Sequence, residues 1–443
     1  MIKSIKLLLL TTIFTVLPLV ADDFFDDFAT DEAGSTNGVE ISGSIDLGLR
    51  SYNFEDMLDE TADVDTNANL KLTYQGSLAD ITLTTKVNKE SITLDECYTN
   101  MYFDKFNVEA GILKTVWGKG DKLHVVDLLN PTDYSTYFIT DYLENKIATP
   151  TVKFNIPLGA TGLLELAYLP TFSSDVLPTS GRWVPNDVKV LLSTVTNLVK
   201  SSAAAKYGEV YTANIGTATP EQIGNATGLA YAASLEVLQA GSDMSQYYQD
   251  TNSLSFGQYA VRGTASLSGY DLGLLYYYGY NSKPELNESK MLLEYEKKQM
   301  IGLEFGRAIL GFNLRGELAY YLMDKSENSL NYVAGFDYNF PIHNLNLNAQ
   351  IKGNYFLDSE NDNTNMVVGK LSDTFNHEAT SLSVTTIYFV EDKDFMIKPE
   401  FTTNIGDTTK LEITTCLFNG DSDTMLGQYD DNDYISVNIN YMF

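Results

Sequence analysis

Hydrophobic and polar residues alternate along most of this chain, in segments of about ten residues separated by turn residues. In residues 344–357 an apolar face opposes an amide-rich face: Leu345, Leu347 and Ala349 against Asn344, Asn346 and Asn348. A period of two predicts β-strands whose two faces meet different surroundings. Strands of soluble sandwiches are commonly about five to six residues long. The longer segments therefore favour strands that cross a hydrocarbon layer at a tilt.

The number of segments bounds the architecture. About seventeen are clear, and a bacterial barrel with both termini on one side needs an even number. Counting residues 366–371 as a further strand gives 18, whereas merging two weak early segments gives 16. We expect an all-β fold, a closed antiparallel transmembrane β-barrel of 16 or 18 strands. Its short hairpins are expected at four dipeptides: Gln75-Gly76, Asp104-Lys105, Ser268-Gly269 and Gly406-Asp407.

The alternation stops over residues 172–258, where the pattern becomes helical. The spacing of apolar residues predicts one helix over residues 188–199, with Asn186 as its cap. A second helix is expected from Pro220, with Thr219 and Gln222 forming a capping box, to Gly241. We interpret the segment as a helical hairpin inserted into an extracellular loop, because strand parity places it opposite the chain termini.

The N-terminal residues have the pattern of a secretory signal. Lys3 and Lys6 precede an apolar run over residues 7–20, and Ala21 is a small residue suited to cleavage. Residues 1–21 are therefore expected to be a signal peptide, residues 22–37 an acidic segment, and residues 38–443 the barrel. No later run of about 18 apolar residues predicts a membrane-spanning helix.

The C-terminal strand is the most specific feature. Ile435, Val437, Ile439, Tyr441 and Phe443 alternate to the last residue, which looks like the C-terminal signature of bacterial outer-membrane barrels. This likeness implies that the barrel assembly machinery binds the chain through Phe443 and that outer-membrane lipid surrounds it. The expected location is the bacterial outer membrane.

Composition supports a barrel without proving one. The chain has 29 Tyr and 22 Phe, and its mean hydropathy is −0.14. Aromatic side chains suit the interfacial girdles of a barrel, although a soluble β-sandwich or β-solenoid would bury them in its core. The net charge of −30 argues against nucleic acid as a partner. The acidic loops are interpreted either as solvated or as bridged by divalent cations to lipopolysaccharide.

Charged residues on the polar faces are the pore-lining candidates. On the lipid side at mid-depth, a charge would cost roughly 2–4 kcal/mol, so we place these side chains inside. The alternative is that they form only salt-bridge ladders along the wall. The candidates are Lys86, Arg315, Glu317, Lys352, Lys398, Glu400, Lys410 and Glu412.

A second candidate region follows a strand at residues 116–133. Trp117 and two glycines make a corner, and the Asn-Pro pair favours a turn. This loop is expected either to fold back and narrow the barrel or to serve as a structural corner. Its constriction candidates are Trp117, Asp121, Asp127, Asn130 and Pro131.

The same loop carries a family resemblance. The Trp-Gly pair, Asp127 and the Asn-Pro-x-Asp sequence ending at Asp133 resemble a family of uncharacterised, porin-like bacterial outer-membrane barrels. Residues 169–183 and 418–443 are similar to two further segments of that family, and Lys119 departs from its pattern. The resemblance implies a barrel in the outer membrane and no reaction. Some members are thought to accompany lipid-handling export systems.

Passive transport of an unidentified small solute is the leading functional interpretation. A transporter of lipophilic molecules such as fatty acids, and a surface-binding or structural barrel, are the alternatives. An enzyme is not expected, because no nucleophile elbow or zinc motif occurs and three histidines are available: His124, His343 and His377. No cofactor or metal is expected.

Overall fold

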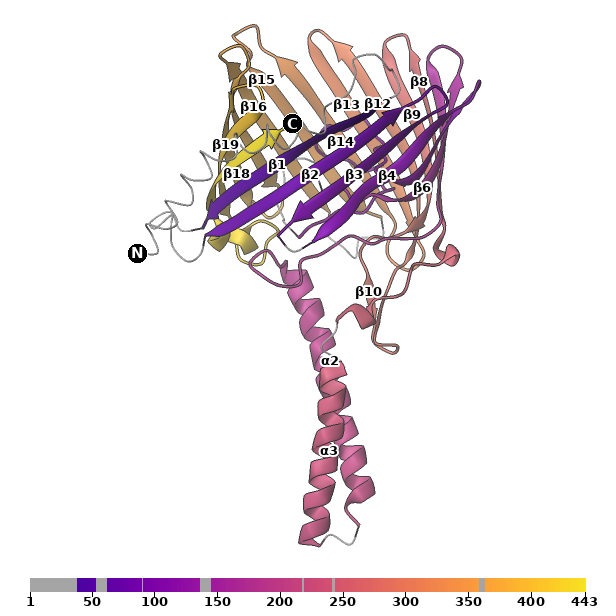
Figure 1. Cartoon of the computed structure of the whole chain (residues 1–443), viewed down its shortest axis with the longest axis vertical. Coiled ribbons are helices and arrows are strands. Elements are labelled where there is room, and N and C mark those ends of the chain that lie inside the picture. The colour runs from indigo at the N-terminus through magenta and orange to yellow at the C-terminus, as the bar shows by residue number, and fades with distance from the viewer. Residues whose placement is uncertain are drawn as a thin grey trace.

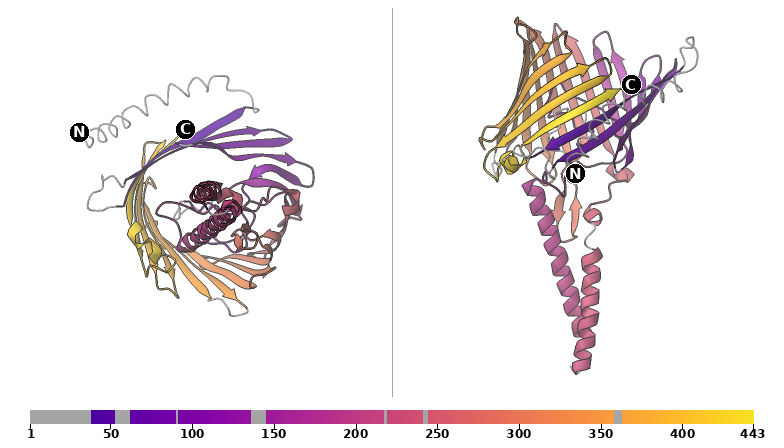
Figure 2. Two further views of the ribbon diagram at one scale, coloured as in Figure 1. Left: turned by 90° about the horizontal axis from the view of Figure 1, so that it is seen from below. Right: turned by 60° about the vertical axis from the view of Figure 1, so that its left-hand side comes forward.

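A closed wall of strands forms the body of the protein (Figures 1 and 2). The computed structural model describes residues 38–52, 62–89, 91–135, 145–216, 219–240, 244–357 and 363–443. The expected signal peptide (1–21) and acidic segment (22–37), and the predicted helix end at Gly241, lie outside the described residues. Within the described residues, 18 strands make one sheet, and antiparallel pairing of β1 with β20 closes it.

The strands follow one another around the wall as a meander. The transmembrane strands are β1 (Val39–Ser51), β2 (Asp63–Gln75), β3 (Ala79–Asn88), β4 (Ile92–Tyr102), β5 (Asn107–Leu113), β6 (Thr149–Leu158), β7 (Gly162–Leu169), β8 (Gln258–Leu267), β9 (Tyr270–Tyr280), β12 (Lys297–Ile309), β13 (Phe312–Met323), β14 (Ser329–Asn339), β15 (Asn346–Phe356), β16 (Thr364–Phe375), β17 (Thr380–Phe389), β18 (Phe395–Ile405), β19 (Thr409–Asn419) and β20 (Tyr434–Met442). A separate small hairpin, β10 (Glu285–Asn287) and β11 (Leu292–Glu294), lies between β9 and β12.

The strand number and turns decide between the sequence-based alternatives. Residues 366–371 belong to β16, so the count of 18 is correct and the merger to 16 is wrong. All four predicted dipeptide turns connect consecutive strands. All four lie at the barrel end that also holds Val39 and Phe443, whereas the longer loops lie at the other end. Short turns at one end and long loops at the other are typical of outer-membrane barrels.

The two faces of the wall differ as the alternation predicted. On β9, Leu272, Leu274 and Tyr276 are 42%, 60% and 39% exposed on the outside. The intervening Leu275 and Tyr277 are buried inside. An apolar outer surface on a closed sheet suits a lipid environment, because every wall strand pairs its backbone groups on both sides. A soluble sandwich is therefore excluded.

The insert between β7 and β8 is a helical hairpin that points away from the barrel (Figure 1; Figure 2, right). It consists of α2 (Asn186–Asn214) and α3 (Pro220–Ala240). The capping box of α3 is confirmed, because Thr219 and Gln222 exchange hydrogen bonds of 3.2 and 3.4 Å. Asn186 as the cap of α2 is wrong: Pro185 holds that position, and the Asn186 side chain binds the carbonyl of Ser422. No helix in the described segments is both long and apolar enough to span a membrane.

The base of the hairpin is fixed to the long-loop end of the barrel. Val195 and Val199 of α2 pack with Tyr247, next to the β10–β11 hairpin. Further down, Ala203, Ala226 and Ala230 are buried, which lets the two helices approach closely. The hairpin stands outside the barrel as a stalk rather than filling it.

Two segments that carried the family resemblance meet at the same end. The ring of Trp183 lies 5.9 Å from that of Phe418 and 5.6 Å from that of Tyr429. Met396, Cys416, Leu426 and Tyr434 complete this cluster. The segment after β7 is therefore attached to the C-terminal hairpin, although about 240 residues separate them in the chain.

Candidate pore and its inward loop

The connection between β5 and β6 enters the barrel. We call its described parts, residues 114–135 and 145–148, the inward loop. Its Leu123 N–H donates to Gln350 on β15 (3.3 Å), and Asp121 accepts from Asn348 on the same strand (2.7 Å). Six strands, β7, β8, β9, β12, β13 and β14, separate β6 from β15 around the wall. The loop therefore spans the lumen.

Asn130 clamps the two ends of the inward loop together. Its side-chain amide donates to the carbonyls of Leu113 and Ile147, both at 3.0 Å, and its oxygen accepts from the Thr115 N–H at 2.6 Å. Leu113 ends β5 and residues 147–148 lead into β6, so one buried side chain joins both feet of the loop. Pro131 follows it and accepts from the Ile147 N–H at 2.9 Å.

Glu317 of β13 holds the tip of the loop against the wall. One carboxylate oxygen accepts from the Gly120 N–H (2.6 Å) and contacts His124 Nδ1 (2.9 Å), and the other accepts from the Val125 N–H (2.7 Å). The side chain is fully buried. Gly118 makes this approach possible: its φ is +111°, and a Cβ there would lie 2.3 Å from the carboxylate.

Trp117 anchors the inward loop to a row of charged side chains on the barrel wall. Its indole N–H donates to Glu165 on β7 at 3.3 Å, and the ring is 1% exposed. Five inward side chains form what we call the wall ladder: Glu109, Lys153, Glu165, Arg262 and Glu304. Lys153 contacts Glu109 and Glu165, and Arg262 contacts Glu165 and Glu304. These pairs satisfy charges that would be costly if buried alone.

Gly273 creates the space that the wall ladder needs. Arg262 on β8 reaches Glu304 on β12 at 2.7 Å, across the intervening strand β9. A Cβ at Gly273 would lie 2.4 Å from the Glu304 side chain. The absence of a side chain at this position therefore lets the two charges meet.

Two ion pairs hold two carboxylates of the inward loop, Asp127 and Asp121. Asp127 and Lys146, from the outgoing and returning parts of the loop, are 2.8 Å apart and buried. Asp121 lies 3.3 Å from Arg315, whose guanidinium also binds Asp337 at 2.7 Å. The loop is thus bonded to itself and to the wall at several separate points.

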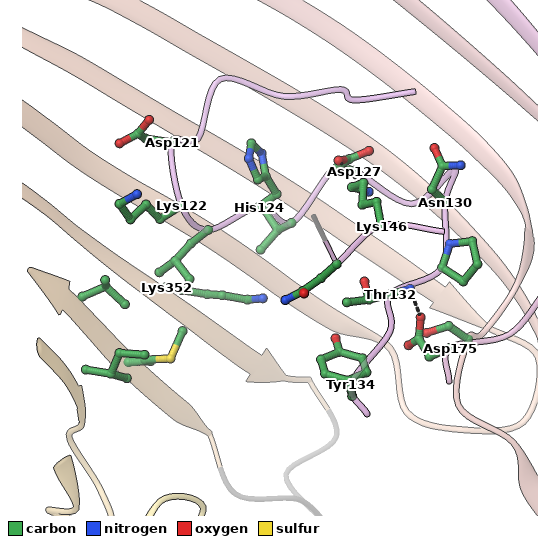
Figure 3. Close-up of a pocket in the computed structure, with 18 of the residues that line it drawn as sticks. Asp121, Lys122, His124, Asp127, Asn130, Thr132, Tyr134, Lys146, Asp175 and Lys352 are labelled. Carbon is green, nitrogen blue, oxygen red and sulfur yellow. Dashed lines mark hydrogen bonds and ion pairs between the residues drawn. The ribbon is translucent and has the colours of Figure 1, made fainter. Parts of the chain in front are cut away.

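The loop leaves a cavity of about 990 Å³ on its far side (Figure 3). Its other boundary is the inner face of β15 to β20. Charged side chains come from both sides, such as Lys122 from the loop and Lys352 from the wall, which Figure 3 shows reaching into the cavity. Asp175, from the segment after β7, accepts from the Thr132 N–H at 2.8 Å at one edge.

The pore-lining candidates fall into two groups. Five line the cavity: Lys352, Lys398, Glu400, Lys410 and Glu412. The other three are engaged elsewhere on the inner side. Arg315 and Glu317 are bound to the inward loop, and Lys86 lies 3.2 Å from Asp95, which also pairs with Lys114.

Of the constriction candidates, four line the cavity: Asp121, Asp127, Asn130 and Pro131. Trp117 lies behind the loop against the wall ladder instead. Sequence reasoning missed the whole wall ladder and several cavity cations, including Arg50, Lys122, Lys298 and Lys370. Strand parity carried a usable signal for Lys298, which lies on the same face of β12 as the buried Glu304.

These features define a class. A closed 18-stranded barrel with an apolar outer surface, short turns on the side of its termini and a charged interior is an outer-membrane β-barrel. The barrel implied by the family resemblance is thus what the strand pairings show.

No protein-family model matches the chain, and no curated protein matches it. Several solved structures follow a similar course. OccAB3 of Acinetobacter baumannii has 8% identity and a TM-score of 0.48, covering 92% of this chain and 99% of its own. OpdL of Pseudomonas aeruginosa has 7% identity and a TM-score of 0.49, with the same coverage. Wzi of Escherichia coli, described as a carbohydrate-binding β-barrel, has 10% identity and a TM-score of 0.48, covering 91% and 85%.

Proposed function

We propose that this chain is a passive channel of the outer membrane for small hydrophilic solutes, narrowed by the inward loop. The observation that carries the proposal is the docking of this loop across the lumen on the buried Glu317. A loop fixed at Glu317, Asn130 and Trp117 sets a lasting constriction, and the polar cavity beside it offers water and solutes a route.

A route for lipophilic molecules is less well supported. Such a route needs an apolar pocket, whereas the cavity beside the loop is lined by many charged side chains. The buried apolar residues at the base of the stalk, Val195 and Val199, pack on Tyr247. Transport without catalysis is part of the proposal, since His124 serves to hold the loop on Glu317.

Electrical recording tests the channel directly. The purified barrel, inserted into a planar lipid bilayer, should give discrete steps of steady current. Liposomes containing it should swell in small sugars and amino acids more slowly as solute size rises. A barrel that inserts but stays electrically silent would contradict the proposal.

The stalk favours a second candidate, a surface-binding function. On α3, Leu229 and Tyr231 are 52% and 63% exposed, and the hairpin extends away from the mouth of the barrel (Figure 1). Large apolar side chains in such a position are available to a partner. A variant without residues 186–240 separates the two functions: a channel keeps its conductance, whereas a binding protein loses the attachment of its partner.

A further inference from the structure

The charge of the cavity is opposite to that of the chain. The whole sequence has 29 basic and 59 acidic residues. The cavity wall reverses this ratio, with eight basic and five acidic side chains. The basic ones are Arg50, Lys122, Lys146, Lys298, Lys352, Lys370, Lys398 and Lys410. A random sample of the chain's charges would give about half as many basic as acidic groups, so the interior is built differently from the surface.

Most of the cavity's acidic groups are neutralised by a neighbour. Asp127 pairs with Lys146 at 2.8 Å and Asp121 with Arg315 at 3.3 Å. On the opposite wall the pairs are Lys398 with Glu400 (3.4 Å) and Lys410 with Glu412 (3.7 Å). Asp175 accepts a hydrogen bond from a backbone N–H. The field inside the cavity is therefore set by the cations that remain.

Five basic side chains supply these remaining charges, and two of them, Arg50 and Lys298, lie over the rings of Tyr434 and Tyr321. The other three are lysines. Among the described residues, Lys122, Lys352 and Lys370 make no ion pair with a carboxylate within 4.0 Å. Lys122 comes from the inward loop, and the other two come from the wall strands β15 and β16. The route past the loop is thus bordered by positive charge on both sides.

The wall lysines are also close to one another. Lys370 pairs in register with Thr385, which pairs with Lys398 on the next strand. Since neighbouring strands lie about 4.8 Å apart, the Cα atoms of the two lysines are about 10 Å apart at the same height in the wall. Lys122, Lys398 and Lys410 are near enough to Lys370 to repel it electrostatically, and Glu400 is near enough to attract it. Lysines held together in this way are stabilised by an anion among them.

We propose that the cavity selects small anions, and that Lys122 of the loop and Lys370 of the wall contact the carboxylate or phosphate group of the passing solute. The proposal rests on the channel function above and names its substrate class. An ammonium group is a mobile donor without an acceptor, so it exchanges anions quickly while excluding cations. The acidic outer loops do not cancel this effect, because salt screens charges beyond about 8–10 Å.

Reversal potentials measure the selectivity. The purified barrel is placed in a planar bilayer between two KCl solutions of different concentration. The wild-type protein should pass chloride in preference to potassium. Lys122→Gln and Lys370→Gln should each lower the chloride-to-potassium permeability ratio by about fourfold, the factor that Coulomb's law gives for charges about 5 Å apart in water. Inorganic phosphate should reduce the chloride current of the wild type more than that of the double variant.

Lys393→Gln is the matched control, because it removes the same charge from an exposed turn outside the cavity. Its permeability ratio should equal that of the wild type. Anion selection is overturned if the wild-type current is potassium-selective, or if the chloride-to-potassium permeability ratio is unchanged in both cavity variants. Either result leaves the proposed channel function intact. A wild-type barrel without current overturns the channel function, and anion selection falls with it. Because the two lysines lie on separate elements, misfolding of one variant leaves the other as a test.

Discussion

Replacing Glu317 with Gln tests whether the inward loop sets the width of the channel. The carboxylate accepts from three backbone N–H groups of the loop and contacts His124. Gln has nearly the same shape but only one accepting oxygen. Its NH2 group would therefore face either Gly120 and His124 or the N–H groups of Val125 and Val126, which are donors.

The cost of this change follows from the number of hydrogen bonds lost. A hydrogen bond to a charged group contributes about 1.5–3 kcal/mol and one to a neutral group about 0.5–1.5 kcal/mol. At least one loop N–H loses its acceptor, and the other contacts lose the charge. Docking of the loop should weaken by about 3–6 kcal/mol. Because about 1.4 kcal/mol corresponds to a factor of ten, the undocked population rises by a factor of about 100 or more.

Single-channel recording reads out this population. Glu317→Gln should show a larger mean conductance and frequent sublevels as the loop leaves the wall and returns. Glu109→Gln is the control, because Glu109 is also an inner carboxylate, but it pairs with Lys153 and not with the loop. If a correctly folded Glu317→Gln barrel gives the same current steps as the wild type, the loop does not limit conduction and the reasoning is refuted.

Three further predictions concern stability. Arg262→Met leaves two buried carboxylates of the wall ladder without their shared cation, and should lower the free energy of unfolding in vesicles by about 3–5 kcal/mol; an unchanged urea midpoint would count against a stabilising ladder. Gly273→Ala should cost about 1–3 kcal/mol by displacing a ladder glutamate, whereas Gly263→Ala, which meets no atom within 4 Å, should cost less in the same titration. Burial by itself would raise the pKa of Glu296, but hydrogen bonds from Ser326 and Lys325 and the charge of Lys325 together hold that pKa below its usual value. This contact therefore stabilises the loops above about pH 4.3 and is lost as the pH falls through the lowered pKa, and hydrogen exchange of these loops should increase only in acid.

The sequence by itself determined the wall. A strand exposes one face to lipid and the other to the interior, so the alternation of residues 344–357 had to place Leu345 outside and Asn348 inside. The even strand count and the side of the hairpin follow from the same rule, and the capping box of α3 follows from a spacing of three residues. Each of these features depends on residues that are near neighbours in the chain.

Only the tertiary structure decided how the interior is used. Glu317 and Gly120 are 197 positions apart, and the alternation showed that Glu317 faces inward but not that the loop covers it. Whether an inward charge joins the wall ladder, binds the loop or stays free in the cavity depends on barrel curvature and on the path of one irregular segment. The local periodicity of the sequence specifies neither the curvature of the barrel nor the path of that segment. Closing the barrel is what brings strands such as β6 and β15 to face each other across the lumen.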